Sequence, residues 1–336
     1  MTKRPRSGGT ATKLAVLDDY HGAALAMADW SGLSDRCAIT VFDDHLADED
    51  ALAARLEGFA IICIMRERTP FSSALLARLP QLRLLVTTGM GNRALDLAAA
   101  TERGVLVCGT RGAPLRTAEL TWALILAVAR NIALEDRAIR NGAWGRTIGQ
   151  DLIGRRLGLV GLGRLGTRVA LIGKAFGMEP VAWSENLTPE LAEERGARWV
   201  DKEALFAESD VVSVHTVLSE RTRGLVGAAE IGLMKPDAIL VNTSRGPIVD
   251  EAALVAALRA GSIAGAGLDV FETEPLAADH PLFALENVVL TPHLGYVTRD
   301  TYRVFYGDTV AAVEAYLAGR PIRVLNPEAE SRVPEG

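Results

Sequence analysis

The chain has 336 residues, of which 49% are hydrophobic and 23% charged, and its formal net charge is −6 at pH 7. That length exceeds the size at which a single hydrophobic core stops growing, so the sequence predicts two domains. The acidic balance argues against a nucleic-acid interface, which needs a basic face. No apolar run approaches the roughly 18 residues that span a bilayer, so no membrane segment is expected.

The first residues and the cysteines bear on where the protein resides. Residues 2–13 are basic and rich in Gly, Ser and Thr, and no apolar signal-peptide core follows them, so we interpret them as a frayed tail. Cys37, Cys63 and Cys108 lie in apolar stretches without the spacing of metal ligands. These features predict buried, reduced thiols in a cytoplasmic protein without a metal site.

Short apolar runs alternate with amphipathic segments in the first half of the chain, which is typical of a parallel sheet linked by crossover helices. The clearest helical patterns cover residues 48–56 and 92–104. A flavodoxin-like unit is therefore predicted, with five strands at residues 13–18, 38–43, 60–65, 82–88 and 105–109.

One long helix is predicted next, from about residue 114 to residue 141. A proline stands near its start and Asn-Gly at its end, as helix termini prefer. The segment is apolar on more than one face, so we expect it to be buried between domains or between subunits.

The second half predicts another doubly wound sheet, with strands at 157–161, near 181, and at 211–216, 238–244, 266–270 and 288–292. The final helix, roughly residues 298–319, would then need a partner, and we expect it to cross back onto the first unit. The predicted fold class is α/β with two doubly wound parallel-sheet domains. These are a discontinuous flavodoxin-like domain, residues 1–111 and 298–336, and a Rossmann domain, residues 112–297.

The segment GLGRLG at 161–166 follows an apolar strand and precedes a helix rich in small residues, which is the context of a dinucleotide-binding loop. Gly161 permits a tight turn, Gly163 lets the backbone approach a pyrophosphate, and Gly166 allows close packing of the helix. The amides of Arg164 and Leu165 would then point at the phosphates, assisted by the helix dipole.

Ser184 and Glu185 stand at the end of the next strand, where an acidic residue normally binds the ribose hydroxyls of NAD. Ser184 removes the anion that would repel a 2′-phosphate, which permits NADP. Yet no arginine or lysine stands beside it to bind that phosphate, and Glu185 could take the ribose role. The residues favour NAD and leave NADP open.

Arg245, Glu274 and His293 each follow a different predicted strand of the second sheet, at the edge that bears the glycine loop. Open α/β sheets bind their ligands at this carboxyl-terminal edge. An arginine fork can hold a carboxylate and a neighbouring carbonyl. A histidine can donate a proton to the carbonyl oxygen, and a glutamate can keep that histidine charged. The three residues therefore predict reduction of a 2-oxo acid by a nicotinamide cofactor.

From about Lys13 to Leu325 the sequence resembles the D-2-hydroxyacid dehydrogenases, which include phosphoglycerate dehydrogenase and glyoxylate/hydroxypyruvate reductases. The resemblance is carried by GLGRLG, LMKPDAILVNTSRGPIVDE, GAGLDVFETEPL and NVVLTPHLG, in the order of the family. It implies catalytic roles for Arg245, Glu274 and His293, and a hold on the nicotinamide carboxamide by Asp269. The coenzyme contacts that it implies are His215, Thr216, Thr243, Ser244, Arg245, Asp269, His293 and Gly295.

The resemblance also implies that the segment TTGMGN at 87–92 presents backbone amides to the substrate carboxylate, with Met90 and Gly91 nearest. Arg66 could be a second anion contact or a solvated loop residue. The expected substrate contacts are thus Arg66, Met90, Gly91, Arg245 and His293. No phosphate clamp is evident, so small acids such as glyoxylate, hydroxypyruvate or pyruvate are favoured.

Other members of this fold leave alternatives open. Formate dehydrogenase has glutamine in place of the glutamate that partners the histidine, so Glu274 favours acid–base chemistry. Phosphite dehydrogenase keeps the same three residues. A dinucleotide-sensing binding protein, like the C-terminal-binding corepressors, also keeps these motifs, but it would need extended tails to contact its partners. The resemblance further implies a homodimer built largely through the nucleotide domain, with the 114–141 helix as an interface element.

Overall fold

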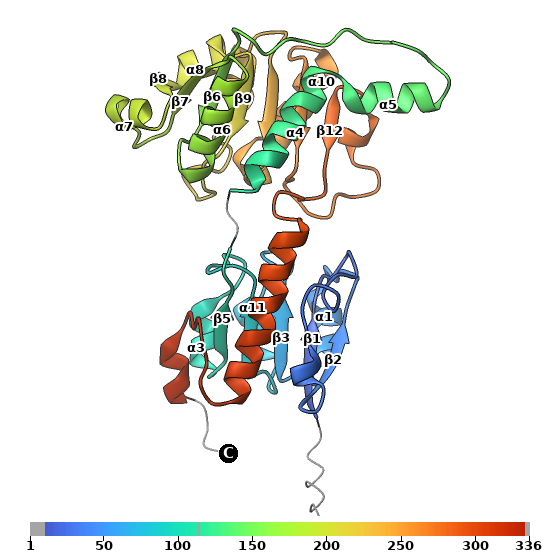
Figure 1. The fold of residues 1–336 in the computed structure, drawn as a ribbon, viewed down its shortest axis with the longest axis vertical. Coiled ribbons are helices and arrows are strands. Elements are labelled where there is room, and N and C mark those ends of the chain that lie inside the picture. Colours follow the sequence, from blue (N-terminus) through green and yellow to red (C-terminus); the bar gives the residue numbers. More distant parts are fainter. Residues whose placement is uncertain (1–10, 113–114, 333–336) are drawn as a thin grey trace, which may run out of the picture. The chain divides into compact units, whose positions relative to one another are not determined.

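The computed structural model describes residues 11–112 and 115–332, so the tail expected over residues 2–13 lies almost entirely outside the described residues. The chain folds into two compact units (Figure 1). One comprises Met1–Ala113 and Thr298–Gly336, and the other Pro114–Val297. Each unit contains one all-parallel sheet flanked by helices, which confirms the predicted α/β class.

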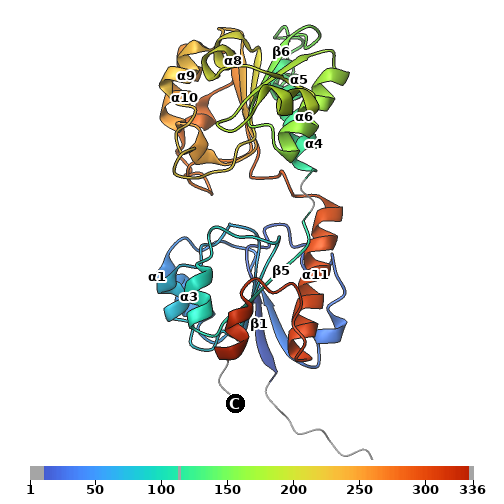
Figure 2. The ribbon, with the colours of Figure 1, turned by 90° about the vertical axis from the view of Figure 1, so that its left-hand side faces the viewer.

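The first unit is a five-stranded sheet in the order β2-β1-β3-β4-β5. Helices α1 and α3 lie on one face of this sheet and α11 on the other (Figure 2). The strands β3, β4 and β5 are buried along their whole length, which is why they read as unbroken apolar runs in the sequence. The strands are β1 (Thr12–Val16), β2 (Cys37–Val41), β3 (Ile61–Ile64), β4 (Leu84–Thr87) and β5 (Leu106–Gly109). The helices are η1 (Ser31–Leu33), α1 (Glu49–Leu56), α2 (Ser73–Ala77), α3 (Leu97–Glu102), α11 (Arg299–Leu317) and η4 (Pro327–Arg332).

The second unit is a seven-stranded sheet in the order β12-β11-β10-β9-β6-β7-β8. The chain runs from β6 to β7 on one side and returns to β9 on the other, so a topological switch point lies at β6. The strands are β6 (Arg156–Val160), β7 (Glu179–Trp183), β8 (Arg198–Trp199), β9 (Val211–Val214), β10 (Ile239–Asn242), β11 (Gly265–Leu268) and β12 (Val288–Leu290). The helices are α4 (Thr117–Ala129), α5 (Ile132–Arg140), α6 (Arg164–Ala175), α7 (Pro189–Glu194), α8 (Lys202–Glu208), α9 (Ala228–Leu233), η2 (Gly246–Ile248), α10 (Glu251–Ala260) and η3 (Pro281–Ala284).

The prediction of one long helix over 114–141 is wrong. The segment forms α4 and α5, which meet at an angle of 62° because Asn131 adopts a left-handed backbone conformation with φ of 51°. Asparagine tolerates this conformation better than most residues, so a helix can end there without glycine. Helix α4 packs on the sheet of its own unit: a Cβ on Gly267 of β11 would lie 2.9 Å from Leu124. Most apolar side chains of α4 are therefore buried within the second unit.

The helix predicted at 92–104 begins only at Leu97, because the Asp96 side chain accepts a hydrogen bond from Ala99 N and caps it. Among the described residues, no single helix is long and apolar enough to cross a membrane. Only the bent pair α4 and α5 passes that test, and it does so by length and composition alone.

Candidate active site

The glycine loop joins β6 to α6 at the carboxyl-terminal edge of the seven-stranded sheet. Gly161 has a φ of +100°, and a Cβ there would lie 2.9 Å from the backbone of His215 and of Thr216. A Cβ on Gly166 would collide with the carbonyl oxygen of Gly161. In contrast, a Cβ on Gly163 would meet no protein atom within 4 Å. Two glycines are therefore required by the protein itself, whereas Gly163 leaves open the space that a pyrophosphate needs.

Helix α6 starts at Arg164, and its N-cap Gly163 has no side chain to satisfy the first amides. Such free amides and the positive end of the helix dipole form an anion site. Arg164 is exposed, and Leu165 is half-buried behind it. Ser184 and Glu185 follow β7 directly, and Ser184 O accepts a hydrogen bond from Leu187 N at 3.0 Å, which closes the turn there.

His215 and Thr216 follow β9, beside the glycine loop. Burial lowers the pKa of His215 to about 4, so its ring is neutral at pH 7. The Nε2 atom lies 2.9 Å from Ser213 Oγ, while the shielded Nδ1 has no hydrogen-bond partner among the described residues. Ser244 Oγ donates to Thr216 O, which ties the end of β10 to the end of β9. His215 and Thr216 therefore lie against Gly161 and Gly166 of the glycine loop, and Ser244 is bonded to them.

Arg245 is held in a tight turn after β10. Asn242, the last residue of that strand, donates from Nδ2 to Arg245 O at 2.9 Å and accepts from Ser244 N at 3.0 Å. Arg245 Nη1 donates to Ser244 O at 2.6 Å. A Cβ on Gly246 would lie 2.5 Å from Glu272 N and collide with the Phe271 carbonyl. The missing side chain at 246 therefore lets the segment that leads to Glu274 pass directly against the arginine turn.

His293 and Glu274 form a hydrogen-bonded pair, with Nδ1 of the ring 2.7 Å from Oε2 of the carboxylate. The second oxygen, Oε1, accepts from Phe271 N at 3.0 Å, so both carboxylate oxygens are fixed. Burial raises the pKa of Glu274, but the hydrogen bond and charge of His293, the Phe271 amide and the charge of Arg245 outweigh it, and the net pKa is lowered. His293 has a left-handed φ of 56°, a conformation that is uncommon for residues other than glycine, although histidine adopts it more often than most. The ring therefore offers Nε2 for proton transfer.

Asp269 fixes the loop that carries His293. Its Oδ1 accepts from Thr291 Oγ1 and from Leu294 N, both at 2.6 Å, and its Oδ2 accepts from Gly295 N at 2.9 Å. Burial raises its pKa despite these bonds. A carboxylate has about four lone-pair sites, so one site on Oδ2 is left for a further donor such as a carboxamide. Asp269 thus has a structural task in addition to the coenzyme role expected from the sequence.

Thr243, next to the arginine turn, is fixed by helix α4. Its Oγ1 lies 2.8 Å from Thr121 Oγ1. Thr117 Oγ1, one turn earlier on α4, donates to Gly295 O at 3.0 Å. The apolar helix α4 therefore also carries two hydroxyls that anchor the edge of the site.

The remaining predicted substrate residues lie in the first unit, after β3 and β4. Arg66 N donates to Thr88 Oγ1 at 2.8 Å, and Arg66 Nη1 donates to Thr88 O at 3.2 Å. A Cβ on Gly89 would collide with that same Nη1, so the guanidinium covers the start of the loop that holds Met90 and Gly91. Met90 is 55% exposed, and a Cβ on Gly91 would meet nothing within 4 Å. Arg66, Met90 and Gly91 therefore share one accessible loop region within that unit.

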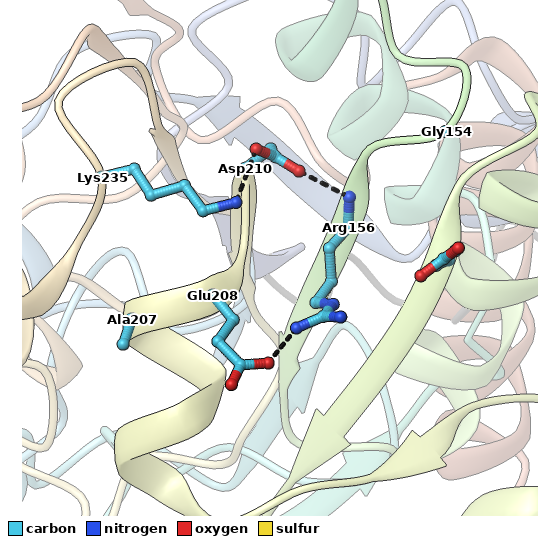
Figure 3. Close-up of a pocket in the computed structure, with 7 residues that line it drawn as sticks. Gly154, Arg156, Ala207, Glu208, Asp210 and Lys235 are labelled. Atoms are coloured by element: carbon cyan, nitrogen blue, oxygen red, sulfur yellow. Dashed lines mark hydrogen bonds and ion pairs between the residues drawn. The ribbon is translucent and has the colours of Figure 1, made fainter.

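A cavity of about 320 Å³ lies at the opposite, amino-terminal edge of the seven-stranded sheet (Figure 3). Some of its charged groups pair with one another: Lys235 Nζ lies 2.9 Å from Asp210 Oδ1, and Arg156 contacts Glu208. Asp210 also accepts from Arg156 N at 2.7 Å. Glu179 also lines the cavity and belongs to neither of these pairs, so the cavity keeps a net negative charge. No residue of the predicted active site lines it.

Comparison with known proteins agrees with this geometry. The family model described as D-isomer specific 2-hydroxyacid dehydrogenase, NAD binding domain, matches residues 122–295. This chain belongs to the D-isomer-specific 2-hydroxyacid dehydrogenases. The resemblance found in the sequence is thereby confirmed, and the second unit of this dehydrogenase is its NAD-binding domain.

The relatives of this dehydrogenase include proteins named as glyoxylate reductases and as D-3-phosphoglycerate dehydrogenases. A glyoxylate reductase from Aeropyrum pernix is 44% identical over 263 residues, which cover 75% of this chain and 78% of that protein. A D-3-phosphoglycerate dehydrogenase from Archaeoglobus fulgidus is 40% identical over 240 residues, 70% of this chain and 46% of that protein. The crystal structure of a phosphoglycerate oxidoreductase from Vibrio cholerae O395 superposes with a TM-score of 0.87 at 36% identity, covering 92% of this chain and 99% of that chain. The dehydrogenase is therefore an oxidoreductase that acts on CH–OH donors with NAD(P).

Sequence reasoning did not single out Asn242, Thr291, Thr117 or Thr121 in this dehydrogenase. Each acts through a hydrogen bond to a residue that it did single out. Asn242 stands within the segment VNTSRG, where a polar residue ending a buried strand could have been noticed. The two threonines of α4 gave no such signal, because their partners are more than 100 residues away in the sequence.

Proposed function

We propose that the enzyme reduces a small 2-oxo acid to the D-2-hydroxy acid, with Arg245, Glu274 and His293 as its catalytic residues. The observation that carries the proposal is the His293 Nδ1 to Glu274 Oε2 hydrogen bond of 2.7 Å, at the sheet edge that also bears the glycine loop. A histidine with one nitrogen held by a carboxylate and the other free has the arrangement of a general acid–base.

Each residue has a distinct task in this proposal. Arg245 binds the acid through its carboxylate and carbonyl oxygen and stabilises the charge that develops on that oxygen. The nicotinamide supplies a hydride to the carbonyl carbon when the cofactor is bound. His293 donates a proton from Nε2 to the oxygen, and Glu274 stabilises the imidazolium that this transfer requires. In the opposite direction neutral His293 accepts the proton from the hydroxyl group.

The coenzyme is proposed to rest on the glycine loop, with its pyrophosphate in the open space at Gly163. Ser184 and Glu185 would receive the adenosine ribose, and His215 and Thr216 would line the adenosine. Thr243, Ser244, Asp269 and Gly295 would contact the nicotinamide side. NAD is the proposed coenzyme, because Glu185 can bind the ribose hydroxyls and no lysine or arginine stands beside Ser184 in the sequence.

The proposed substrate class is the small unphosphorylated 2-oxo acids, with glyoxylate first because a relative at 44% identity is a glyoxylate reductase. Arg66, Met90 and Gly91 are proposed to contact the acid from the first unit. Arg66 supplies a positive charge and Met90 and Gly91 supply backbone amides, which together suit a carboxylate.

The test is oxidation of NADH and of NADPH by glyoxylate, hydroxypyruvate, pyruvate and phosphohydroxypyruvate, with wild type and His293→Ala compared. We expect turnover of a small acid with NADH and a loss of about 10²- to 10⁴-fold in the variant. Preference for the phosphorylated acid would refute the proposed substrate class. Tight NADH binding without turnover of any acid would instead indicate a dinucleotide-sensing protein.

A homodimer is also proposed. The segment 132–153, which contains α5, projects from its unit (Figure 1) and exposes large apolar side chains that a monomer rarely presents together. These side chains, between 52% and 96% exposed, are Ile132, Ile139, Trp144, Ile148 and Ile153. We expect a dimer in sedimentation equilibrium and a monomer after Trp144→Glu with Ile148→Glu; a monomeric wild type would contradict this. Cys37, Cys63 and Cys108 are buried and form no disulfide among the described residues, which supports a reducing, cytoplasmic location.

A further inference from the structure

Three neighbouring strands of the first unit end in one hydrogen-bonded cluster. The strands β2, β1 and β3 are adjacent and parallel, so their carboxyl ends meet at one edge of the sheet. His45 follows β2, Asp18 follows β1, and Thr69 lies in the loop after β3. That loop contains Arg66, the residue proposed to contact the substrate.

Asp18 is the centre of this cluster, and its side chain is only 2% exposed. Its Oδ2 accepts from Thr69 Oγ1 at 2.7 Å, and its Oδ1 lies 3.0 Å from His45 Nδ1. Its carbonyl oxygen accepts from Arg68 Nη1 at 2.6 Å. Two of these three bonds go to the loop after β3, 50 and 51 residues away in the sequence. Asp18 is therefore the group on β1 that restrains that loop.

Arg66 requires such restraint because its backbone is in the left-handed region, with a φ of 54°. This conformation is unfavourable for a long side chain and persists only where the surroundings impose it. On one side Thr88 and Asn92 hold the residue: Arg66 N donates to Thr88 Oγ1 at 2.8 Å, and Asn92 Nδ2 donates to Arg66 O at 2.7 Å. On the other side the restraint comes through Arg68 and Thr69, which are bound to Asp18.

Asp18 is itself left-handed, with a φ of 57°. Aspartate adopts this conformation more readily than most residues, so of the two left-handed residues Arg66 is the strained one. The two residues follow adjacent strands and are linked through Arg68 and Thr69. Strain of this kind is concentrated at functional sites, where it fixes a side chain in the pose that binding needs.

We propose that Asp18 is a positioning residue for substrate binding, acting through Arg66. It holds the loop after β3 so that the Arg66 guanidinium stays over Gly89, where it meets the substrate carboxylate. This inference rests on the proposed function, in which Arg66 contacts the acid. The coenzyme site belongs to the other unit, so the effect of Asp18 is on the affinity for the acid and not on that for NADH.

The test compares Asp18→Asn with Asp19→Asn. Asparagine keeps the size of aspartate and tolerates left-handed backbone, but it is uncharged and has an amide nitrogen in place of one carboxylate oxygen. Thr69 and His45, which contact different oxygens of Asp18, can then no longer each donate to an oxygen of their own. Asp19 is the matched control because it is equally buried and accepts three hydrogen bonds, from Ala23 N, Ala24 N and Tyr306 OH, none of them in the loop after β3. We expect Asp18→Asn to raise KM for the acid by about tenfold, as loss of one or two such bonds would. Asp19→Asn should leave that KM within about twofold of wild type, and neither variant should alter the Kd for NADH.

A double-mutant cycle with Arg66→Ala separates positioning from general destabilisation. If Asp18 acts through Arg66, adding Asp18→Asn to Arg66→Ala leaves KM for the acid where Arg66→Ala alone put it. Thr69→Val should raise KM in the same direction as Asp18→Asn, and Thr69→Ser should restore it. Equal effects of Asp18→Asn and Asp19→Asn on KM, or full additivity with Arg66→Ala, would overturn the role of Asp18 and leave the reductase intact. If the wild type turns over no 2-oxo acid, both the proposed reductase activity and the positioning role of Asp18 would be refuted.

Discussion

Gly246 offers a direct test of how closely the arginine turn and the glutamate segment must pack. A Cβ at this position would lie 2.5 Å from Glu272 N and closer still to the Phe271 carbonyl, whereas ordinary contacts begin near 3.4 Å. Both obstacles are backbone, and the Phe271 carbonyl would lie 1.9 Å from the new Cβ, so in Gly246→Ala the two segments must separate by about 1 to 1.5 Å. That shift moves Arg245 relative to the His293–Glu274 pair. A misplacement of about 1 Å costs on the order of 10²-fold in rate, so kcat should fall by about that factor.

The variant should still fold, because overpacking costs about 1–3 kcal/mol, below the roughly 5–15 kcal/mol that stabilise a typical domain. The assay measures kcat and KM for the acid, the Kd for NADH, and thermal unfolding. Gly232→Ala is the matched control: Gly232 lies in α9, and a Cβ there would meet nothing within 4 Å. It should stabilise the protein slightly, as alanine does in a helix, with unchanged kcat. A folded Gly246→Ala enzyme with kcat within threefold of wild type would refute the reasoning.

Two further predictions concern Gly163 and His215, which belong to the proposed coenzyme site. Gly163→Ala should fold like wild type, because its Cβ meets no protein atom within 4 Å, but its methyl group would occupy the pyrophosphate space and raise the Kd for NADH by about tenfold or more; unchanged affinity in fluorescence titration would contradict this placement. His215 has a folded pKa of about 4, below its ordinary 6.5, so the unfolded chain binds the proton more tightly and stability falls as pH drops from about 6.5 to about 4. The full loss is about 3 kcal/mol, and in urea unfolding His215→Asn should flatten the pH dependence over that interval; identical profiles would show that the ring is not buried neutral.

Much of the fold could be predicted because strands buried on both faces leave unbroken apolar runs. Within residues 11–112 and 115–332, every strand longer than two residues was predicted, and β8, Arg198–Trp199, was missed. The break at Asn131 could not be foreseen, since the apolar pattern continues through it and a left-handed residue depends on its surroundings. The motif residues Arg245, Glu274 and His293 were found because each stands just after a strand, where parallel topology brings such positions to one edge.

The contacts that position those residues were largely invisible in the sequence. Asp269 was expected to contact the coenzyme. Its carboxylate also accepts hydrogen bonds from Leu294 N and Gly295 N, and these two bonds depend on how β11 and β12 pair. The role of Asp18 could not be predicted from the sequence, because its partner Thr69 is 51 residues away and neither residue belongs to a recognisable motif. The spacing of residues within a motif can predict which groups act together locally. The contacts that restrain a loop cannot be predicted in this way, because they depend on which strand ends are neighbours in the folded sheet.

The central claim is that His293 transfers the proton during reduction of a 2-oxo acid. The most direct measurement is single-turnover oxidation of enzyme-bound NADH on rapid mixing with glyoxylate, in wild type and in His293→Ala at matched NADH saturation. We predict rapid oxidation by wild type and a rate lower by about 10²-fold or more in the variant, with NADH affinity unchanged. Equal single-turnover rates for the two proteins would contradict the account.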